Sequence, residues 1–189
     1  MYDLETGSFW SQISGAAVQG VLKGKKLAML PASIQTWRTW YADRPETLVL
    51  ELGAVTPRKS GLEPAMRLAE DAMIGVTAGG HYRGYHVESV RSLGIVNDEI
   101  GGMPVLVYVG PESRSRVYHR AIGTHTLTFE MTNGIPTDLE TGSKWDLNAG
   151  IATDGTLDGK KLEQQSFVLS YGWTWQMFHP ESSIYAVEE

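Results

Sequence analysis

Short apolar runs separated by glycine and polar residues recur along the chain, and this pattern is typical of strands joined by tight turns. Residues 105–109 form a continuous apolar run with three valines, and Leu127, Phe129 and Met131 alternate with polar residues. The β-branched and aromatic residues in these runs favour strands over helices. Further strands are expected at residues 9–13, 16–22, 26–30, 47–52, 73–77, 82–86, 116–120 and 183–187.

Three short segments predict helices, and residues 56–73 could form either a further helix or a long loop. In residues 33–43, Ile34, Trp37 and Tyr41 share one face at helical spacing, and Pro45 closes the segment. Two more short helices are expected at residues 87–93 and 171–178, and a turn is expected at residues 97–102. The pattern as a whole predicts a mainly β protein with short helices, of the β-rich α+β class.

The strongest pattern is a repetition of sequence at an offset of 135 residues. The run Asp-Leu-Glu-Thr-Gly-Ser occupies residues 3–8 and again residues 138–143, each time followed by a tryptophan two positions later. The same offset, without a gap, relates Gly15, Ala17, Gly20, Leu22, Leu27 and Trp40 to Gly150, Ala152, Gly155, Leu157, Leu162 and Trp175. So many matches in one register indicate an internal duplication and predict two related lobes.

The repetition divides the chain into two unequal parts. We expect a first repeat unit at residues 1–52, a linker at residues 53–80 and a second, more complete unit at residues 81–189. The second unit contains the other repeat copy, at residues 138–187. A chain of 189 residues is long enough to bury a substantial core in one large or two small domains.

Composition and charge exclude several classes of function. The chain has no cysteine, which rules out disulfides, thiolate metal ligands and thiol catalysis. Its net charge of −6 argues against nucleic-acid binding, which needs clustered Lys and Arg. No apolar run approaches the ~20 residues that a membrane-spanning helix needs, and residues 1–12 lack the pattern of a signal peptide. We therefore expect no nucleic acid and no membrane span, and no motif indicates a cofactor.

Paired carboxylates occur in both repeat copies, as Asp3 with Glu5 and as Asp138 with Glu140. In an extended segment both members of a pair would leave one face, as a hydrolase or a hard-cation site requires. The alternative is that each Asp orders its turn while each Glu lies at the surface. We favour the turn role, because few enzymes need two identical catalytic sets in one small chain.

Two histidines, His119 and His125, flank the connection between two expected strands. If they met across a hairpin, they could bind Zn or Cu together with a third ligand such as His81 or Glu130. The sequence has no tight ligand spacing such as His-Glu-x-x-His. The two histidines are therefore a weak candidate for a metal site.

Tryptophans offer a further candidate site. Trp37 and Trp173 have no tryptophan at the equivalent repeat position, which makes them candidates for an exposed aromatic platform that binds a ligand. The tryptophans that do have an equivalent are expected as core anchors: Trp10 with Trp145, and Trp40 with Trp175. No Gly-x-Ser-x-Gly elbow supports nucleophilic catalysis by a serine.

Several motifs follow one another in order: Tyr-Asp-Leu-Glu-Thr-Gly-Ser-Phe-Trp at residues 2–10, Gly-Val-Leu-Lys-Gly-Lys-Lys-Leu at 20–27, Ile-Val-Asn-Asp at 95–98, Gly-Gly-Met-Pro-Val at 101–105 and Trp-Thr-Trp-Gln-Met-Phe-His-Pro at 173–180. With this set the chain resembles the prokaryotic domain-of-unknown-function family 3179. Members usually carry Cys-Pro-x-Cys where this chain has Gly110, Pro111, Glu112 and Ser113, so the resemblance implies no redox or copper role there.

The resemblance also bears on function. Family members usually have a half-unit before the first repeat block, so we expect the strand edge of the first lobe to be open here. An open edge invites pairing with a partner protein or self-association. We therefore predict a non-catalytic binding or interaction module. Because many family members are exported, the resemblance implies an accessory subunit of a cell-envelope complex, in the periplasm. The alternative is a hydrolase or metal-dependent enzyme that uses the Asp/Glu pairs or His119 and His125.

Overall fold

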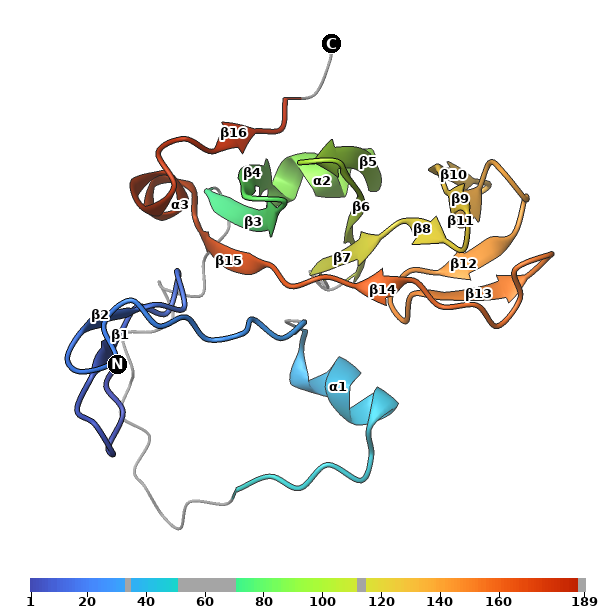
Figure 1. Cartoon of the computed structure of the whole chain (residues 1–189). Coiled ribbons are helices and arrows are strands. Elements are labelled where there is room, and N and C mark those ends of the chain that lie inside the picture. The colour runs from blue at the N-terminus through green and yellow to red at the C-terminus, as the bar shows by residue number, and fades with distance from the viewer. Residues whose placement is uncertain (33–34, 51–70, 112–114, 187–189) are drawn as a thin grey trace.

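The computed structural model describes residues 1–32, 35–50, 71–111 and 115–186 (Figure 1). It consists of short strands in several small sheets, with three short helices among the described residues. The β-rich α+β class predicted from the hydrophobic pattern is therefore confirmed. Each of the three helices expected at residues 33–43, 87–93 and 171–178 is present, and each is seven residues long. The possible helix at residues 56–73 lies mostly outside the described residues, and its last two residues belong to a strand.

One four-stranded sheet begins with a hairpin around Gly79 and Gly80, which joins the strands predicted at residues 73–77 and 82–86. Both glycines have a positive φ, of 57° and 80°, which turns the chain between antiparallel β3 and β4. The other two strands come from far along the chain, β15 beside β3 and β16 in parallel beside β4. The bounds are Ala72–Ala78 for β3, His81–His86 for β4, Val168–Tyr171 for β15 and Ser183–Ile184 for β16.

A second four-stranded sheet follows in the order β14-β7-β6-β5, with every neighbouring pair antiparallel. Helix α2 (Val87–Leu93) connects the two sheets and ends at Gly94, which has φ 76°. The bounds are Ile95–Ile100 for β5, Met103–Val109 for β6, Ser115–His119 for β7 and Glu163–Gln164 for β14. The turn predicted at residues 97–102 is wrong over 97–100, which continue β5; only Gly101 and Gly102 turn.

Strand β6 separates two hydrophobic cores because successive side chains of a strand point to opposite faces. Val105, Val107 and Val109 pack in one core with β3, β5 and α2. Leu106 and Tyr108 pack in the other core with residues of the C-terminal repeat copy. The continuous apolar run thus reflects a strand that is buried on both faces.

A third four-stranded sheet contains the first part of that C-terminal repeat copy, in the order β10-β11-β12-β13. Phe129 and Trp145 meet edge to face in its core, with ring centroids 5.5 Å apart. The bounds are Phe129–Thr132 for β10, Ile135–Asp138 for β11, Lys144–Asp146 for β12 and Ile151–Asp154 for β13. A small hairpin, β8 (Ala121–Ile122) with β9 (His125–Thr126), precedes this sheet.

Helix α3 (Gly172–Phe178) covers the outer face of the first sheet. Trp175, which is only 1% exposed, lies against Gly75 of β3 and Gly84 of β4. A Cβ atom on Gly75 would lie 2.2 Å from the indole ring, so the glycine makes room for the tryptophan. The core role expected for the four repeated tryptophans is confirmed for Trp145 and Trp175 by their burial. It is wrong for Trp40, which is 40% exposed, and Trp10 is only partly buried.

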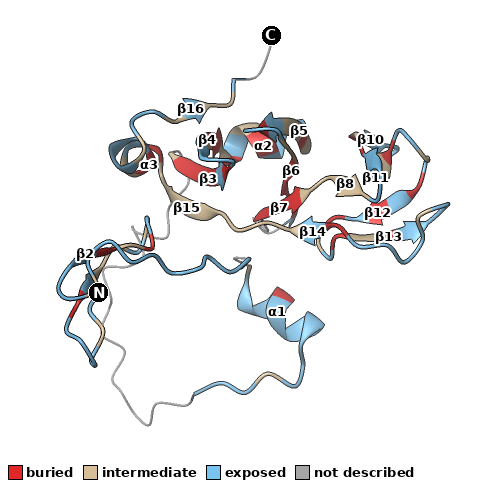
Figure 2. Ribbon diagram, in the orientation of Figure 1, coloured by how far each residue is buried: buried red, intermediate tan, exposed pale blue. Residues whose placement is uncertain are grey.

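The first fifty residues form a separate, poorly covered part of the chain. They contain β1 (Phe9–Trp10), β2 (Ala17–Gln19) and α1 (Trp37–Asp43). In Figure 1 this blue and cyan segment runs below the three sheets, and in Figure 2 it is mostly pale blue, the colour of exposed residues. We call residues 1–50 the N-terminal copy and residues 136–185 the C-terminal copy.

Two predicted strands of the N-terminal copy are wrong in the described residues. Lys26 makes only an isolated bridge with Ala16, and residues 27–32 lie in no strand. Residues 47–50 likewise lie in no strand, and residues 51 and 52 are outside the described part. Of the expected linker at residues 53–80, the described end contains β3.

Candidate functional site

The repeated Asp-Leu-Glu-Thr-Gly-Ser run forms the same hydrogen-bonded turn in both copies. The Asp3 carboxylate accepts from the Thr6 backbone N–H (2.6 Å), from the Thr6 hydroxyl (2.7 Å) and from Trp10 Nε1 (2.9 Å). The corresponding distances to the Asp138 carboxylate are 2.7, 2.8 and 2.9 Å, from Thr141 N, Thr141 Oγ1 and Trp145 Nε1. Each aspartate therefore fixes a turn and orients a tryptophan.

The serine of each run completes the turn. Ser8 Oγ lies 2.8 Å from Thr6 Oγ1 and accepts from the Leu22 backbone N–H at 3.2 Å. Ser143 repeats both contacts, at 2.7 Å to Thr141 Oγ1 and 3.0 Å from Leu157 N. Both serines are fully buried and have no adjacent base among these partners. Their hydroxyls are therefore structural links rather than nucleophiles.

The carboxylate pairs do not act as pairs in this geometry. Hydrogen bonds from Trp10 and Thr6 lower the pKa of Asp3 to about 2, so its carboxylate is ionised at neutral pH. Glu5 is exposed, and Glu140 accepts from the Thr128 backbone N–H at 2.7 Å. The carboxylate of each Asp accepts hydrogen bonds within its own turn, whereas the Glu140 carboxylate accepts from Thr128 in a different segment.

The two candidate metal-binding histidines lie on different strand pairs. His119 ends β7, opposite Val105 and Glu163. His125 lies on β9 opposite Ile122, so the β8–β9 hairpin does not place the two histidines across from each other. In the ranges that the structure describes, no three His, Cys, Asp or Glu side chains are grouped to hold a metal ion.

The two candidate platform tryptophans are both exposed. Trp37 on α1 lies 5.6 Å from the Tyr41 ring, and Trp173 on α3 stacks 6.2 Å from the Tyr171 ring. Each pair is formed within its own helix or at that helix's first turn. The structure therefore brings an aromatic neighbour to each tryptophan but gives no contact between Trp37 and Trp173.

An ionic network that the sequence does not reveal links the first two sheets. Arg83 Nη1 donates to both oxygens of the Asp98 carboxylate at 2.7 Å, and Tyr85 donates to Asp98 Oδ2 at 2.8 Å. The bond to Asp98 raises the pKa of Arg83, and burial, followed by the bond to Asp98, raises the pKa of Tyr85. Both shifts hold the arginine charged and the tyrosine neutral.

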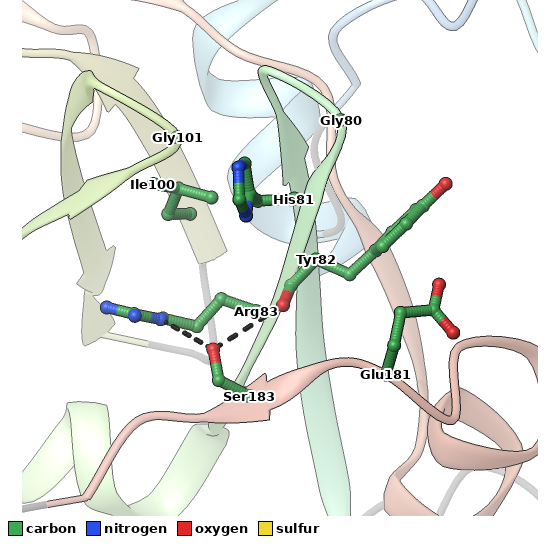
Figure 3. A pocket seen from close by; sticks show the side chains of 8 residues that line it. All are labelled: Gly80, His81, Tyr82, Arg83, Ile100, Gly101, Glu181 and Ser183. Atoms are coloured by element: carbon green, nitrogen blue, oxygen red, sulfur yellow. Dashed lines mark hydrogen bonds between the residues drawn. The ribbon is translucent and has the colours of Figure 1, made fainter.

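A cleft of about 220 Å³ lies beside this network (Figure 3). His81, Arg83 and Ile100 lie on one side of β4, while Tyr82 and Glu181 lie on the other. Ser183 Oγ accepts from Arg83 Nε at 2.9 Å and donates to the Tyr82 carbonyl at 3.5 Å. Because β4 separates the histidine from the glutamate, these groups do not form a nucleophile with its base.

A second cavity, of about 210 Å³, lies between the N-terminal copy and the first sheet. Leu27 and Met29 line it from the N-terminal copy, opposite Phe167, Trp175 and His179. The His179 ring stacks on Tyr82 at 4.2 Å, and burial lowers its pKa. At this cavity the N-terminal copy is not closely packed against the first sheet.

Comparison with known proteins identifies a family but no activity. A family model described as "Protein of unknown function (DUF3179)" matches residues 1–73 and residues 63–182, which confirms the predicted resemblance. No curated protein and no solved structure matches the chain. Within the described ranges, no helix has the length and apolar character needed to cross a membrane.

Proposed function

The chain belongs to the family described as Protein of unknown function (DUF3179), and we propose that it is a non-catalytic module that binds another protein through its N-terminal copy. An accessory subunit of a cell-envelope complex is the setting that the family resemblance implies. The proposal is carried by one observation, the concentration of exposed apolar side chains within residues 1–50.

Most of the large apolar side chains that are exposed in the described residues belong to this segment. They are Met1, Tyr2, Leu4, Phe9, Val18, Val21, Leu27, Met29, Leu30, Trp37, Trp40, Tyr41, Leu48, Val49 and Leu50. A soluble monomer rarely exposes a large contiguous apolar patch, and such patches commonly mark sites of association. Aromatic and methionine side chains in this set are also the types enriched at protein interfaces.

The positions of the candidate polar residues favour a binding module over an enzyme. A hydrolase needs an acid, a base and a nucleophile or water within one pocket. The carboxylates of Asp3 and Asp138 accept hydrogen bonds that hold their turns. His119 and His125 lie on separate strand pairs. This arrangement favours a structural role for the polar groups and a partner-binding role for the exposed apolar surface.

Site-specific photocrosslinking in cells of the source organism tests this proposal. A photoreactive amino acid replaces Leu30 or Leu48, which are 78% and 95% exposed, and the matched control replaces Leu139, at 56%. We expect the same polypeptide to be crosslinked from both Leu30 and Leu48 and not from Leu139. Absence of a shared crosslinked polypeptide, or equal capture from Leu139, would contradict the proposal.

A further inference from the structure

The second cavity, of about 210 Å³, lies on the outer face of the first sheet, beside helix α3. Gly75 and Thr77 of β3 line it together with Tyr82 of β4, which pairs with Thr77. Because successive side chains of a strand point to opposite faces, these residues face away from the core that β3 shares with β5 and α2. The cavity therefore continues the glycine-lined face on which Trp175 packs.

Three aromatic rings form one wall of this cavity. The His179 ring stacks on Tyr82 with centroids 4.2 Å apart, and it lies 4.3 Å from the Trp175 ring. Burial lowers the pKa of His179, so its imidazole is neutral at neutral pH. The wall is thus an uncharged aromatic surface, on which another aromatic ring packs favourably.

The N-terminal copy supplies an apolar wall of the same cavity. Ile13, Leu27 and Met29 line it, and Leu27 and Met29 remain 54% and 46% exposed. In the C-terminal copy, polar residues take the places of two of these side chains, with Asn148 at the position of Ile13 and Gln164 at that of Met29. A ligand with an apolar body would bury surface that the protein itself leaves exposed here.

This open wall does not come from a different local fold. The backbone N–H groups of Leu27 and Leu162 donate to equivalent glycine carbonyls at 2.9 and 2.8 Å, yet Leu162 is only 6% exposed. Residues 28–30 and 48–49 lie in no strand, whereas their equivalents in the C-terminal copy include β14 and β16. The N-terminal copy therefore has the turns of its equivalent with less cover over its apolar side chains.

Two hydrogen-bond donors of the N-terminal copy, Lys26 and Ser14, also line the cavity. The isolated bridge between Ala16 and Lys26 holds their segments beside each other. The Ser14 hydroxyl accepts from the Ala16 backbone N–H at 3.4 Å, which leaves its hydrogen able to donate. No carboxylate is among the described residues that line the cavity. An ammonium and a hydroxyl without a carboxylate are complementary to a single negative charge.

The size of the cavity limits what it can hold. A cavity of about 150 Å³ holds one benzene molecule, so 210 Å³ has room for one ring and a short polar group. We propose that this cavity binds a small aromatic monocarboxylate. The ring packs between the aromatic wall and the side chains of Leu27 and Met29, and the carboxylate accepts from Lys26 and Ser14.

The test uses phenylacetate as the probe and the full chain as the protein. The uncharged analogue is 2-phenylethanol, and acetate supplies the carboxylate without a ring. Methyl groups of leucine, methionine and valine are isotope-labelled, and their NMR shifts are followed in each titration. We expect saturable shifts at Leu27, Met29 and Val168, which line the cavity, with a dissociation constant of about 1 mM or below for a ligand of this size.

The two other probes separate the ring from the charge. We expect 2-phenylethanol to bind about fivefold more weakly than phenylacetate, because it forms no ion pair with Lys26. We expect acetate to give no saturable shift at the three methyl groups, because it has no ring to pack against the aromatic wall.

Matched variants test the residues. Lys26→Gln removes the charge at the cavity, and its control is Lys161→Gln, at the equivalent position, which does not line the cavity. We expect Lys26→Gln to weaken phenylacetate binding about fivefold, as for one partly exposed ion pair, and to leave 2-phenylethanol unchanged. Lys161→Gln should change neither. Met29→Gln should weaken both aromatic probes about threefold or more, because it places an amide in the apolar wall.

Several results would overturn the inference. These are the absence of saturable shifts at the three methyl groups, equal affinity for 2-phenylethanol, and equal effects of Lys26→Gln and Lys161→Gln. Shifts spread evenly over exposed leucines that do not line the cavity, such as Leu30, Leu48 and Leu139, would indicate adsorption to apolar surface and would also overturn it. The inference stands apart from the proposed function, because it concerns a small molecule and requires no protein partner.

Discussion

At the scale of single residues, the repeated aspartate shows how a carboxylate that resembles a catalytic group can be structural. Asp3 and Asp138 accept hydrogen bonds from equivalent donors at distances that agree within 0.1 Å. The sequence predicted this turn role from the repetition. It did not predict the network of Arg83, Tyr85 and Asp98, because those residues have no characteristic spacing and meet only when two sheets pack.

The ionisation of Asp3 provides a residue-scale test. We expect a pKa of about 2 in the folded protein, below the ordinary value near 3.9, because Trp10 and Thr6 donate to the ionised form. Since the folded pKa is the lower one, the turn's contribution to stability is present above about pH 4 and is lost as the pH falls toward 2. Carbon-detected NMR titration of the Asp3 carboxyl measures this pKa.

The matched control for this titration is Trp10→Phe, which removes the largest of the hydrogen bonds that lower the pKa. We expect the pKa of Asp3 to rise toward its ordinary value in this variant. A pKa near 3.9 for Asp3 in the unaltered protein, with no response to Trp10→Phe, would contradict the turn role.

At the scale of elements, the hydrophobic pattern predicted several of the strands that have a neighbour, such as β3, β4 and β6, but missed others, such as β5 and β13. It also predicted strands at two segments that have no neighbour. The paired strands β3 and β4, and the buried β6, were predicted from glycine turns and apolar runs. Residues 26–30 and 47–52 carry the same kind of pattern, but a strand exists only where a second strand accepts and donates its hydrogen bonds. Local sequence cannot tell whether that neighbour is present.

The packing of α3 on the first sheet provides an element-scale test. In Gly75→Ala the new Cβ would lie 2.2 Å from the Trp175 ring, so the helix and the sheet must move apart. We expect the free energy of unfolding to fall by about 1–3 kcal/mol, as for other overpacked cores. Urea denaturation measures the loss.

A double-mutant cycle with Trp175→Ala isolates this contact. In the Trp175→Ala background the space beside Gly75 is open, so Gly75→Ala should have little effect on the free energy of unfolding. An equal loss of stability in both backgrounds would show that Gly75 is required for a reason other than the tryptophan.

At the scale of the whole molecule, three sheets pack in layers around two cores, and the N-terminal copy lies outside them. Figure 2 shows this as buried residues gathered in the sheets and exposed residues along the blue and cyan segment of Figure 1. The repetition in the sequence predicted two equivalent segments. It could not show that only the C-terminal segment is buried, because that segment packs against strands from elsewhere in the chain.

The central claim is that the N-terminal copy has the fold of its equivalent but lacks its cover, and amide hydrogen exchange of the unaltered protein tests it most directly. We predict fast exchange at residues 28–30 and 48–49 and protected amides at Gln165 and Tyr185, which donate to the Val117 and Gly84 carbonyls at 2.8 and 2.9 Å. Equal protection of the two sets in the monomer would contradict the claim, because the N-terminal copy would then already be covered.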